Sequence, residues 1–362
     1  MSTPSTEILQ QPTSPVRSTQ TSKSRGETKY QAWVARAAKQ PMVLETVDLG
    51  PLGAEEVEVT VEHCGLCHSD LSIFNNDWGI SQFPAILGHE VVGRVSAVGA
   101  YAKGLAVGQR VGVGWYSDSC MHCRQCMSGS HHLCPQVQPT IVGHRGGFAT
   151  HIRSHWAWAF PLPEKLKFAE AGPLLCGGVT VFSPLAMYAK PTQRVGIIGI
   201  GGLGHMAVKF AAAYGCEAIA FGSRRANVDE VKGFGASQVV STDDSTAVKK
   251  LAGTIDLLIS TVNVKLDWGA MIGMLAPNGR LHTVGAVAEP IPVEAFSLIL
   301  QQRSVSGSPS GSPVTIGTML DFAARHDIAP QNEHFPMSQL NKAMARLESG
   351  KAHYRIVLDA DF

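Results

Sequence analysis

A glycine-rich turn between an apolar strand and a helix constrains the fold of this chain more than any other feature. The segment Arg194–Ile200 is a continuous apolar run of the kind found in buried parallel strands, and it leads into Gly199-Ile-Gly-Gly-Leu-Gly204. A helical stretch, His205–Tyr214, follows at once. The glycines allow a tight turn, and the helix N-terminus can receive a pyrophosphate. In this context the pattern predicts a Rossmann-type dinucleotide-binding unit.

The residues after this turn alternate between strand and helix patterns, as a doubly wound parallel sheet requires. Together with Arg194–Ile200 they predict six strands, the number in a complete Rossmann sheet. The other strands are expected near Ala218–Phe221, Gln238–Ser241, Ile255–Ser260, Arg280–Val284 and Val305–Gly307. Helices are expected near Val228–Phe234, Thr246–Leu251, Leu266–Leu275 and Pro292–Gln302.

The chain before this unit has a different pattern. The segment Glu56–Glu62 alternates polar and apolar residues, which predicts a half-buried strand. Val91–Val98 and Arg110–Trp115 are two more expected strands, and the glycines and short turns between them favour an irregular β-rich body over βαβ units. At the other end of the chain we expect a helix at Thr315–His326, a helix at Ser338–Glu348 capped by its serine, and a strand at Tyr354–Leu358.

Three residues far apart in the sequence offer ligands to a catalytic metal. Cys67 lies in His63-Cys-Gly-Leu-Cys-His-Ser-Asp70, His89 follows 22 residues later, and Cys176 stands far downstream. Two sulfurs and one nitrogen, with a fourth position open for substrate, form a catalytic zinc site. Each part alone is a weak signal, because a lone Cys-x-x-Cys is often a redox pair and a buried cysteine usually just packs.

A second group of cysteines has the spacing of a structural metal site. Cys120, Cys123, Cys126 and Cys134 can close a tetrahedral zinc site that leaves no position for substrate. An iron–sulfur cluster is the alternative, because Cys-x-x-Cys-x-x-Cys also occurs in ferredoxins and Cys134 precedes Pro135. The ligands of the first site favour zinc here as well.

Composition narrows the class of protein. The chain has 362 residues, enough for about two domains, and its net charge of +1 without a basic patch argues against a nucleic-acid or membrane-surface partner. No apolar run reaches the roughly 18–20 residues that cross a bilayer. Four of eight cysteines crowd into 120–134 without an evident secretory leader, so reduced thiols in a cytoplasmic enzyme are expected. Residues 1–28 are expected to be a disordered tail, with a targeting peptide or added leader as the alternative.

Taken in order, these motifs resemble the zinc-dependent medium-chain alcohol dehydrogenases, and most closely the cinnamyl-alcohol-dehydrogenase-like branch with its bacterial NADPH-dependent aldehyde reductases. The resemblance covers about residues 29–360. It implies an α/β fold with a β-rich, GroES-like catalytic domain at 29–175 and 309–362 and a Rossmann domain between, at 176–308. It is carried by Cys64-Gly-Leu-Cys-His-Ser-Asp70, Gly88-His-Glu-Val-Val-Gly93, Leu175-Cys-Gly-Gly-Val-Thr180 and His353-Tyr-Arg-Ile-Val-Leu358.

The resemblance implies roles for the residues around the first metal site. Cys67, His89 and Cys176 match the ligands of the catalytic zinc. Glu90 matches an acid that can approach the metal when no substrate is bound, and Asp70 matches a carboxylate that orients His89. Two zinc ions per chain are therefore expected.

Other matching residues imply contacts with substrate and cofactor. Ser69 matches the hydroxyl that accepts the alcohol proton, His68 a basic residue near the pyrophosphate, and Trp115 a wall of the substrate pocket. Alternatively, His68 simply caps or packs and Trp115 is an ordinary core aromatic. Ser72 stands where the family often has a histidine in its proton relay. The cofactor contacts implied are Thr180, Gly199, Gly201, Gly202, Leu203, Gly204 and Arg355.

The choice of cofactor is predicted from the end of the second strand of the Rossmann sheet. Proteins that bind NAD usually place an acid there, on the ribose 2′-hydroxyl. This strand instead ends in Gly222-Ser223-Arg224-Arg225, and guanidinium groups suit a 2′-phosphate. Arg224 and Arg225 at a solvated helix start are the alternative. The sequence therefore favours NADPH.

These observations lead to a functional hypothesis with two alternatives. We expect a zinc enzyme that transfers a hydride between NADPH and an aldehyde. The altered residue Ser72 leaves room for an iminium or activated-alkene reductase, and a non-catalytic NADPH-binding protein is the third possibility. A homodimer is expected, paired through the edge strand near Val305–Ser308.

Overall fold

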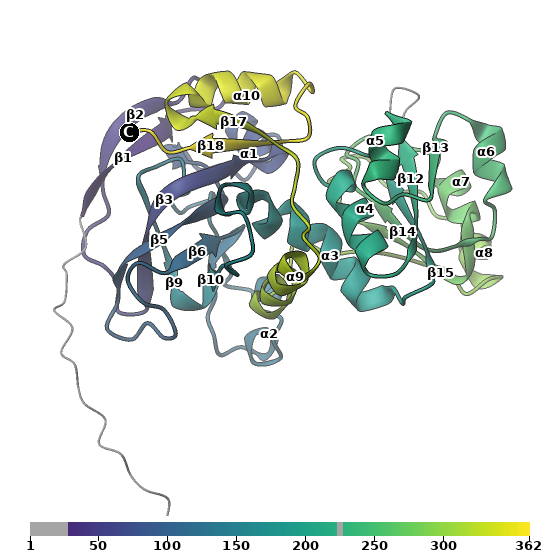
Figure 1. Cartoon of the computed structure of the whole chain (residues 1–362), viewed down its shortest axis with the longest axis horizontal. Coiled ribbons are helices and arrows are strands. Elements are labelled where there is room, and N and C mark those ends of the chain that lie inside the picture. The colour runs from purple at the N-terminus through teal and green to yellow at the C-terminus, as the bar shows by residue number, and fades with distance from the viewer. Residues whose placement is uncertain (1–27, 223–226) are drawn as a thin grey trace, which may run out of the picture.

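The computed structural model describes residues 28–222 and 227–362. The predicted tail, apart from its last residue, and the predicted phosphate contacts Ser223, Arg224 and Arg225 lie outside the described residues. Figure 1 shows a β-rich part that contains both the start and the end of the described chain, and an α/β part that contains the middle. Helix α3 (Gly177–Tyr188) lies between them.

Within the described residues the β-rich part holds a seven-stranded sheet in the order β10-β6-β5-β3-β18-β17, with β9 paired to β3. Its strands are β3 (Glu56–Leu66), β5 (Glu90–Val98), β6 (Arg110–Val113), β9 (His151–His155), β10 (Ala159–Pro161), β17 (Asn332–Pro336) and β18 (Arg355–Asp359). Smaller sheets join β1 (Lys29–Ala35), β2 (Val43–Asp48) and β4 (Ala85–Ile86), and β7 (Tyr116–Asp118) with β8 (Gln138–Pro139). The expected strands of this part are confirmed.

The last strand of the chain returns to the first large sheet. Strand β18 pairs antiparallel with β3, so that Ile356 lies opposite Leu66 and Asp359 opposite His63. In Figure 1 the yellow end of the chain lies beside the purple beginning, with α10 (Leu340–Glu348) over it. This pairing brings Arg355, at the start of β18, next to the end of β3 from which Cys67 follows.

The α/β part is a parallel sheet of six strands among the residues described, in the order β13-β12-β11-β14-β15-β16. This is the Rossmann order, so the predicted fold class is confirmed. The strands are β11 (Arg194–Ile198), β12 (Glu217–Gly222), β13 (Gln238–Ser241), β14 (Ile255–Ser260), β15 (Leu275–Thr283) and β16 (Ser304–Gly307). The helices are α4 (Gly204–Ala213), α5 (Val228–Gly233), α6 (Ser245–Lys250), α7 (Trp268–Gly273) and α8 (Ala295–Ile299). Helix α9 (Pro313–Arg325) follows this sheet in the chain and packs against α3 and against β10 of the β-rich part.

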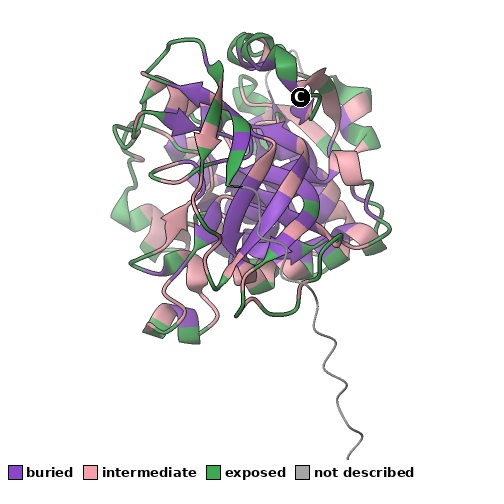
Figure 2. Cartoon of the chain, turned by 90° about the vertical axis from the view of Figure 1, so that its left-hand side faces the viewer, coloured by how far each residue is buried: buried purple, intermediate pink, exposed green. Residues whose placement is uncertain are grey.

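Strand β11 is apolar without alternation because both of its faces are covered. Val195 and Ile197 belong to the buried cluster on one face, and Ile198 to the cluster on the other. Figure 2 shows the buried residues running through the sheets while the loops around them stay exposed. Burying one such side chain fully is worth about 1.5–3 kcal/mol, so this central strand anchors the glycine turn that follows it.

Some expected elements differ from the observed ones. Strand β3 runs past Glu62 to Leu66, because its later residues pair with both β5 and β18. The helix expected at Pro292–Gln302 is the shorter α8. The predicted cap by Ser338 is wrong: its hydroxyl donates to the Asp361 carboxylate, and a 3₁₀ turn, Met337–Gln339, precedes α10.

Three helices of the structure were not expected from the sequence pattern, the shortest being α2 (Arg124–Met127) within the second group of cysteines. Helix α1 (His68–Asn75) begins directly at the metal-binding motif, and α3 contains glycines and Pro184 yet lies buried along most of its length. Neither shows a clear apolar stripe, which is the signal that reveals surface helices. No helix in the described ranges is long and apolar enough to span a membrane.

Candidate metal centre and nucleotide cleft

The first ligand residue, Cys67, stands at the junction of β3 and α1. Its backbone N–H donates to the Asp70 carboxylate at 3.0 Å, which closes the first turn of the helix. The strand fixes the position of Cys67 from one side and the capped helix from the other. The chain therefore holds this thiol in place before any metal binds.

Asp70 ties the second ligand to the first. Its carboxylate, fully buried, accepts hydrogen bonds from Nδ1 of His89 at 3.0 Å and from the backbone N–H of Gly88 at 2.9 Å. With Nδ1 engaged in this way, Nε2 of His89 is left as the ligand atom, and it lies 3.3 Å from Sγ of Cys176. The predicted orienting role of Asp70 thus has its geometry in the structure.

The ligand atoms of Cys67, His89, Glu90 and Cys176 all lie within 4.8 Å of one another. They come from three distant segments of the chain, and all four residues are buried. Two sulfurs, one imidazole nitrogen and one carboxylate form a donor set that fits a zinc ion. The residues that the sequence proposed as one site are brought together.

The pKa values of these side chains shift in different directions, and only that of Cys67 shifts toward the form that binds metal. A hydrogen bond with Cys176 lowers the pKa of the Cys67 thiol well below its usual value, in spite of burial, and the charge of Arg355 lowers it further. The same bond, together with burial, raises the pKa of Cys176. Burial alone would lower the pKa of His89, but the Asp70 carboxylate raises it. Cys67 is therefore the thiolate among these ligands, whereas Cys176 and His89 give up a proton when a cation binds.

Glu90 pairs with Arg355 inside the same buried region. The guanidinium donates to one carboxylate oxygen of Glu90, and its Nη1 lies 3.9 Å from Sγ of Cys67. The other carboxylate oxygen has no hydrogen-bond partner among the described residues and would collide with a Cβ at Gly65. Burial raises the pKa of Glu90 to about 7, with Arg355 acting in the opposite direction. Sequence reasoning named both residues but not this ion pair.

The glycine turn has the conformation that a phosphate site needs. Gly199 has φ +88°, a left-handed conformation that suits glycine, and a Cβ at Gly204 would collide with the carbonyl of Gly199. A Cβ at Gly202 would lie 3.1 Å from the Arg355 side chain. Arg355 therefore reaches from the metal ligands to the turn, which agrees with its expected place near a pyrophosphate.

The remaining predicted residues lie around the same region. Oγ of Ser69 is 3.8 Å from Sγ of Cys67, and His68 is exposed at the first position of α1. Thr180 is buried on α3, whose glycine Gly177 faces Leu203 at the start of α4. The roles expected for these residues stay predictions.

Trp115 forms one wall of the metal site. Its ring meets the His89 ring edge to face, with centroids 4.8 Å apart. Trp78, which the sequence analysis did not single out, packs against Trp115 with centroids 6.1 Å apart and is partly exposed. A large aromatic in the loop after the metal-binding motif was the only signal for it in the sequence.

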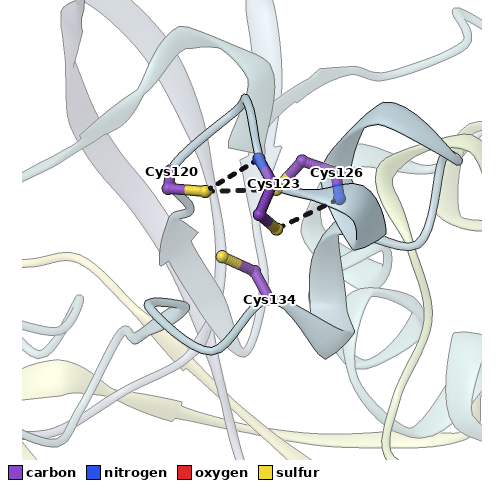
Figure 3. Close-up of side chains that lie close together, drawn as sticks. All are labelled: Cys120, Cys123, Cys126 and Cys134. Atoms are coloured by element: carbon purple, nitrogen blue, oxygen red, sulfur yellow. Dashed lines mark hydrogen bonds between the residues drawn. The ribbon is translucent and has the colours of Figure 1, made fainter.

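The other cysteines form a separate group on a lobe of the β-rich part. Figure 3 shows Cys120, Cys123, Cys126 and Cys134 with their sulfurs turned inward, and these sulfurs lie within 4.8 Å of one another. Backbone N–H groups of Cys123 and Cys126 donate to the sulfurs of Cys120 and Cys123. A hydrogen bond with the backbone of His122 is the main cause that lowers the pKa of Cys120, to about 6. A closed site of four thiolates fits zinc in a structural role.

Comparison with known proteins agrees with this geometry. Residues 53–164 match the alcohol dehydrogenase GroES-like domain, and residues 202–325 match the zinc-binding dehydrogenase family. The chain is 51% identical over 330 residues to an aldehyde reductase of Synechocystis, covering 91% of this chain and 97% of the relative. The chain belongs to the medium-chain alcohol dehydrogenase family.

Other members of this family are similar over nearly the whole described chain. A Mycolicibacterium smegmatis NADP-dependent alcohol dehydrogenase is 34% identical over 338 residues, with 91% of this chain and 97% of the relative covered. The structure of a Sorghum bicolor cinnamyl alcohol dehydrogenase superposes with a TM-score of 0.88 at 35% identity, covering 91% of this chain and 97% of that one. The resemblance to this family, the fold class and the assignment as an oxidoreductase are confirmed.

Proposed function

We propose that this dehydrogenase reduces aldehydes to primary alcohols with NADPH and catalyses the reverse reaction with NADP⁺. The observation that carries the proposal is the buried set of Cys67, His89 and Cys176 beside the glycine turn. The similarity to an aldehyde reductase supports the direction and the substrate class. Aldehydes and primary alcohols are therefore the substrate classes to test.

The residues of the chain supply the binding, the orientation and the proton. When bound, zinc at Cys67, His89 and Cys176 supplies Lewis-acid polarisation of the carbonyl, and NADPH supplies the hydride. Asp70 keeps the proton of His89 on Nδ1 and so leaves Nε2 to the metal. Ser69 passes a proton at its Oγ to the substrate oxygen.

Trp115 and Trp78 shape the side of the site that the substrate enters. Their rings stand edge to face, and Trp115 also covers the ring of His89. Large apolar surfaces here exclude water and hold the apolar part of an aldehyde against the reacting centre. We therefore expect bulky or aromatic aldehydes to be accepted.

The preference for NADPH is part of the proposal. Ser223, Arg224 and Arg225 would hold the 2′-phosphate, and they follow directly from Gly222 at the end of β12. A relative whose name specifies NADP supports this choice. Cys120, Cys123, Cys126 and Cys134 would hold the second, structural zinc.

We also propose that the chain divides as the sequence predicted, with one domain at 29–175 and 309–362 and the other at 176–308. The pairing of β18 with β3 supports the return of the chain to the first domain. The separate parallel sheet of β11 to β16 supports the limits of the second. The cytoplasmic location stays a prediction.

We propose a homodimer paired through the α/β parts. Strand β16 is the edge of the described parallel sheet, and an exposed edge is a template for pairing. Beside it, α8 exposes Phe296 at 72% and Leu300, which follows the helix, at 75%. Exposed apolar side chains next to the edge strand β16 fit pairing with a second copy of the same chain.

A panel of aldehydes, iminium compounds and activated alkenes, each assayed with NADPH, tests the proposed reaction. Aldehyde turnover far above the other two classes supports it. Faster reduction of C=N or C=C bonds would favour the alternative that Ser72 suggested. No turnover on any aldehyde, in protein that holds two zinc ions, would indicate a binding protein instead.

A further inference from the structure

His205 is a buried histidine whose ring is fully engaged. It is the second residue of α4, directly after the glycine turn, and its side chain is not exposed. Histidine is only intermediate among the residue types in how often it is buried, because its ring has two polar nitrogens. Its burial here calls for partners at both nitrogens.

The partners of His205 lie on two different parts of the chain. Nδ1 donates to the carbonyl of Gly201 at 3.0 Å, and Nε2 accepts the backbone N–H of Gln331 at 3.1 Å. Since Gln331 offers only a donor at that point, the ring is neutral with its proton on Nδ1. The backbone N–H of His205 also donates to the Gly201 carbonyl, so the turn is held twice.

Gln331 continues the connection to Arg355. Its carbonyl accepts the backbone N–H groups of Tyr354, at 3.2 Å, and of Arg355, at 3.0 Å. The Tyr354 ring stacks on His205 with centroids 4.8 Å apart and an angle of 18° between planes. A continuous series of hydrogen bonds therefore runs from the glycine turn through His205 and Gln331 to Arg355. The side chain of Arg355 in turn contacts Glu90 and Cys67.

We propose that His205 is a positioning residue for the cofactor pyrophosphate, which it serves by holding the Gly201 turn in register with the segment that carries Arg355. The inference rests on the proposed binding of NADPH. The N–H groups of the turn and the Arg355 guanidinium approach the phosphates from two parts of the chain. Such a site needs its two halves placed to within a fraction of an ångström, and a link between them supplies that placement.

The surroundings of His205 keep its ring in the neutral form. Burial lowers the pKa of His205 to about 3. A proton on Nε2 would also face the Gln331 N–H. The charged and titratable groups around the ring are Lys209 on its own helix, His353, Tyr354 and Arg355 on the return segment, and Glu230, which Tyr354 meets with its hydroxyl. Cofactor binding should therefore show no step from His205 above pH 5.

Two variants separate the two hydrogen bonds. His205→Leu removes both and leaves the Gly201 carbonyl and the Gln331 N–H without their partner. His205→Asn keeps an amide donor near the place of Nδ1 and loses only the bond to Gln331. We expect NADPH affinity to fall about tenfold or more in both variants, because each loses the bond to Gln331 that joins the turn to the Arg355 segment.

Adenosine 2′-monophosphate is the second probe, because it shares the phosphoadenosine end of NADPH but lacks the pyrophosphate. Titration of the zinc-loaded protein with each ligand gives the two dissociation constants. His205→Leu should weaken NADPH while leaving adenosine 2′-monophosphate within about twofold of wild type, which is the precision of such a comparison. A general loss of structure would weaken both ligands together.

His282 provides the matched control. It is equally unexposed, lies on β15 of the α/β part that also holds α4, and bonds through both ring nitrogens, to Ser306 and Ser308 at 2.9 Å. His282→Leu should lower the melting temperature without changing the ratio of the two affinities. Unchanged NADPH affinity in His205→Leu, or equal weakening of both ligands, overturns the inference. If wild-type protein itself does not bind NADPH, the proposed function fails instead.

Discussion

The Asp70 carboxylate and the His89 ring form a hydrogen bond of 3.0 Å in a place where neither side chain is exposed at all. The same carboxylate accepts the N–H of Cys67. One side chain thus sets the direction of two ligand residues. The consequences of this contact, and of others in the structure, can be measured.

Removing the negative charge of Asp70 should weaken the catalytic metal site. In Asp70→Asn an NH2 group replaces one of the two oxygens that accept from Cys67, Gly88 and His89, and the charge beside His89 is lost. Outer-sphere changes of this kind cost roughly 10- to 100-fold in metal affinity. Zinc competition with a chelator measures the change. The control is Asp77→Asn, because Asp77 is an exposed acid just beyond α1. This variant should bind zinc as wild type does. Equal zinc affinity in all three proteins would refute the role of Asp70.

Loss of a ligand should affect stability at one metal site and activity at the other. Elemental analysis of the intact protein should give two zinc ions per chain. Cys126→Ser should lower the melting temperature by about 5 °C or more, because a structural zinc holds its lobe together. Cys67→Ser should abolish turnover with little change in melting temperature. The reverse pattern, or iron in place of zinc, would mean that the sites are wrongly assigned.

Cofactor preference should depend on Arg224. A guanidinium bound to the 2′-phosphate contributes about ten- to hundredfold in affinity, so Arg224→Ala should raise KM for NADPH by that factor and leave KM for NADH nearly unchanged. The exposed Lys232 on α5 gives a matched loss of charge in Lys232→Ala, for which we expect no change. Equal weakening of both cofactors in Arg224→Ala would contradict the prediction.

The buried histidines should make stability depend on pH. Burial lowers the pKa of His205 to about 3 and that of His282 to about 4. An unfolded chain binds a proton to each near pH 6.5, so the unfolded state holds more protons between about pH 6.5 and 4 and stability falls as pH falls through this window. The melting temperature of wild type should drop there, and less steeply in His282→Leu.

The control for this measurement is the exposed His326, and His326→Asn should keep the wild-type slope. Melting temperatures at several pH values between 7 and 4.5 give the slopes directly. If His282→Leu and wild type run parallel across the window, the buried ring does not contribute as expected.

A charge on the apolar surface beside β16 should separate the dimer. Leu300→Glu places a carboxylate where the proposed interface buries an exposed leucine, and a buried unpaired charge costs several kcal/mol. Light scattering at micromolar concentration should then report the mass of one chain in place of two. Tyr101→Glu changes an equally exposed apolar residue of the β-rich part and should remain dimeric. A monomeric wild-type protein would refute the pairing itself.

Much of the site could be predicted because its chemistry is local in the sequence. Cys67, Ser69 and Asp70 lie within one motif, and the glycine turn follows directly from an apolar strand. Residue types and short spacings therefore predicted the metal donors and the nucleotide fold. Helix α3 escaped prediction because a buried helix has no polar face to give it a period, and α1 escaped it because its eight residues show no clear apolar stripe.

The sequence by itself determined which atoms are available: two thiol groups and an imidazole, four further thiols, and a turn that only glycines can form. Tertiary structure alone decided which of them meet. The contacts of Arg355 with Glu90 and of His205 with Gln331 join residues 265 and 126 positions apart. Such pairs leave no trace in local patterns. The first depends on which distant strands pair in one sheet, the second on how the two parts of the chain are placed against each other, and both on burial that makes polar atoms find partners.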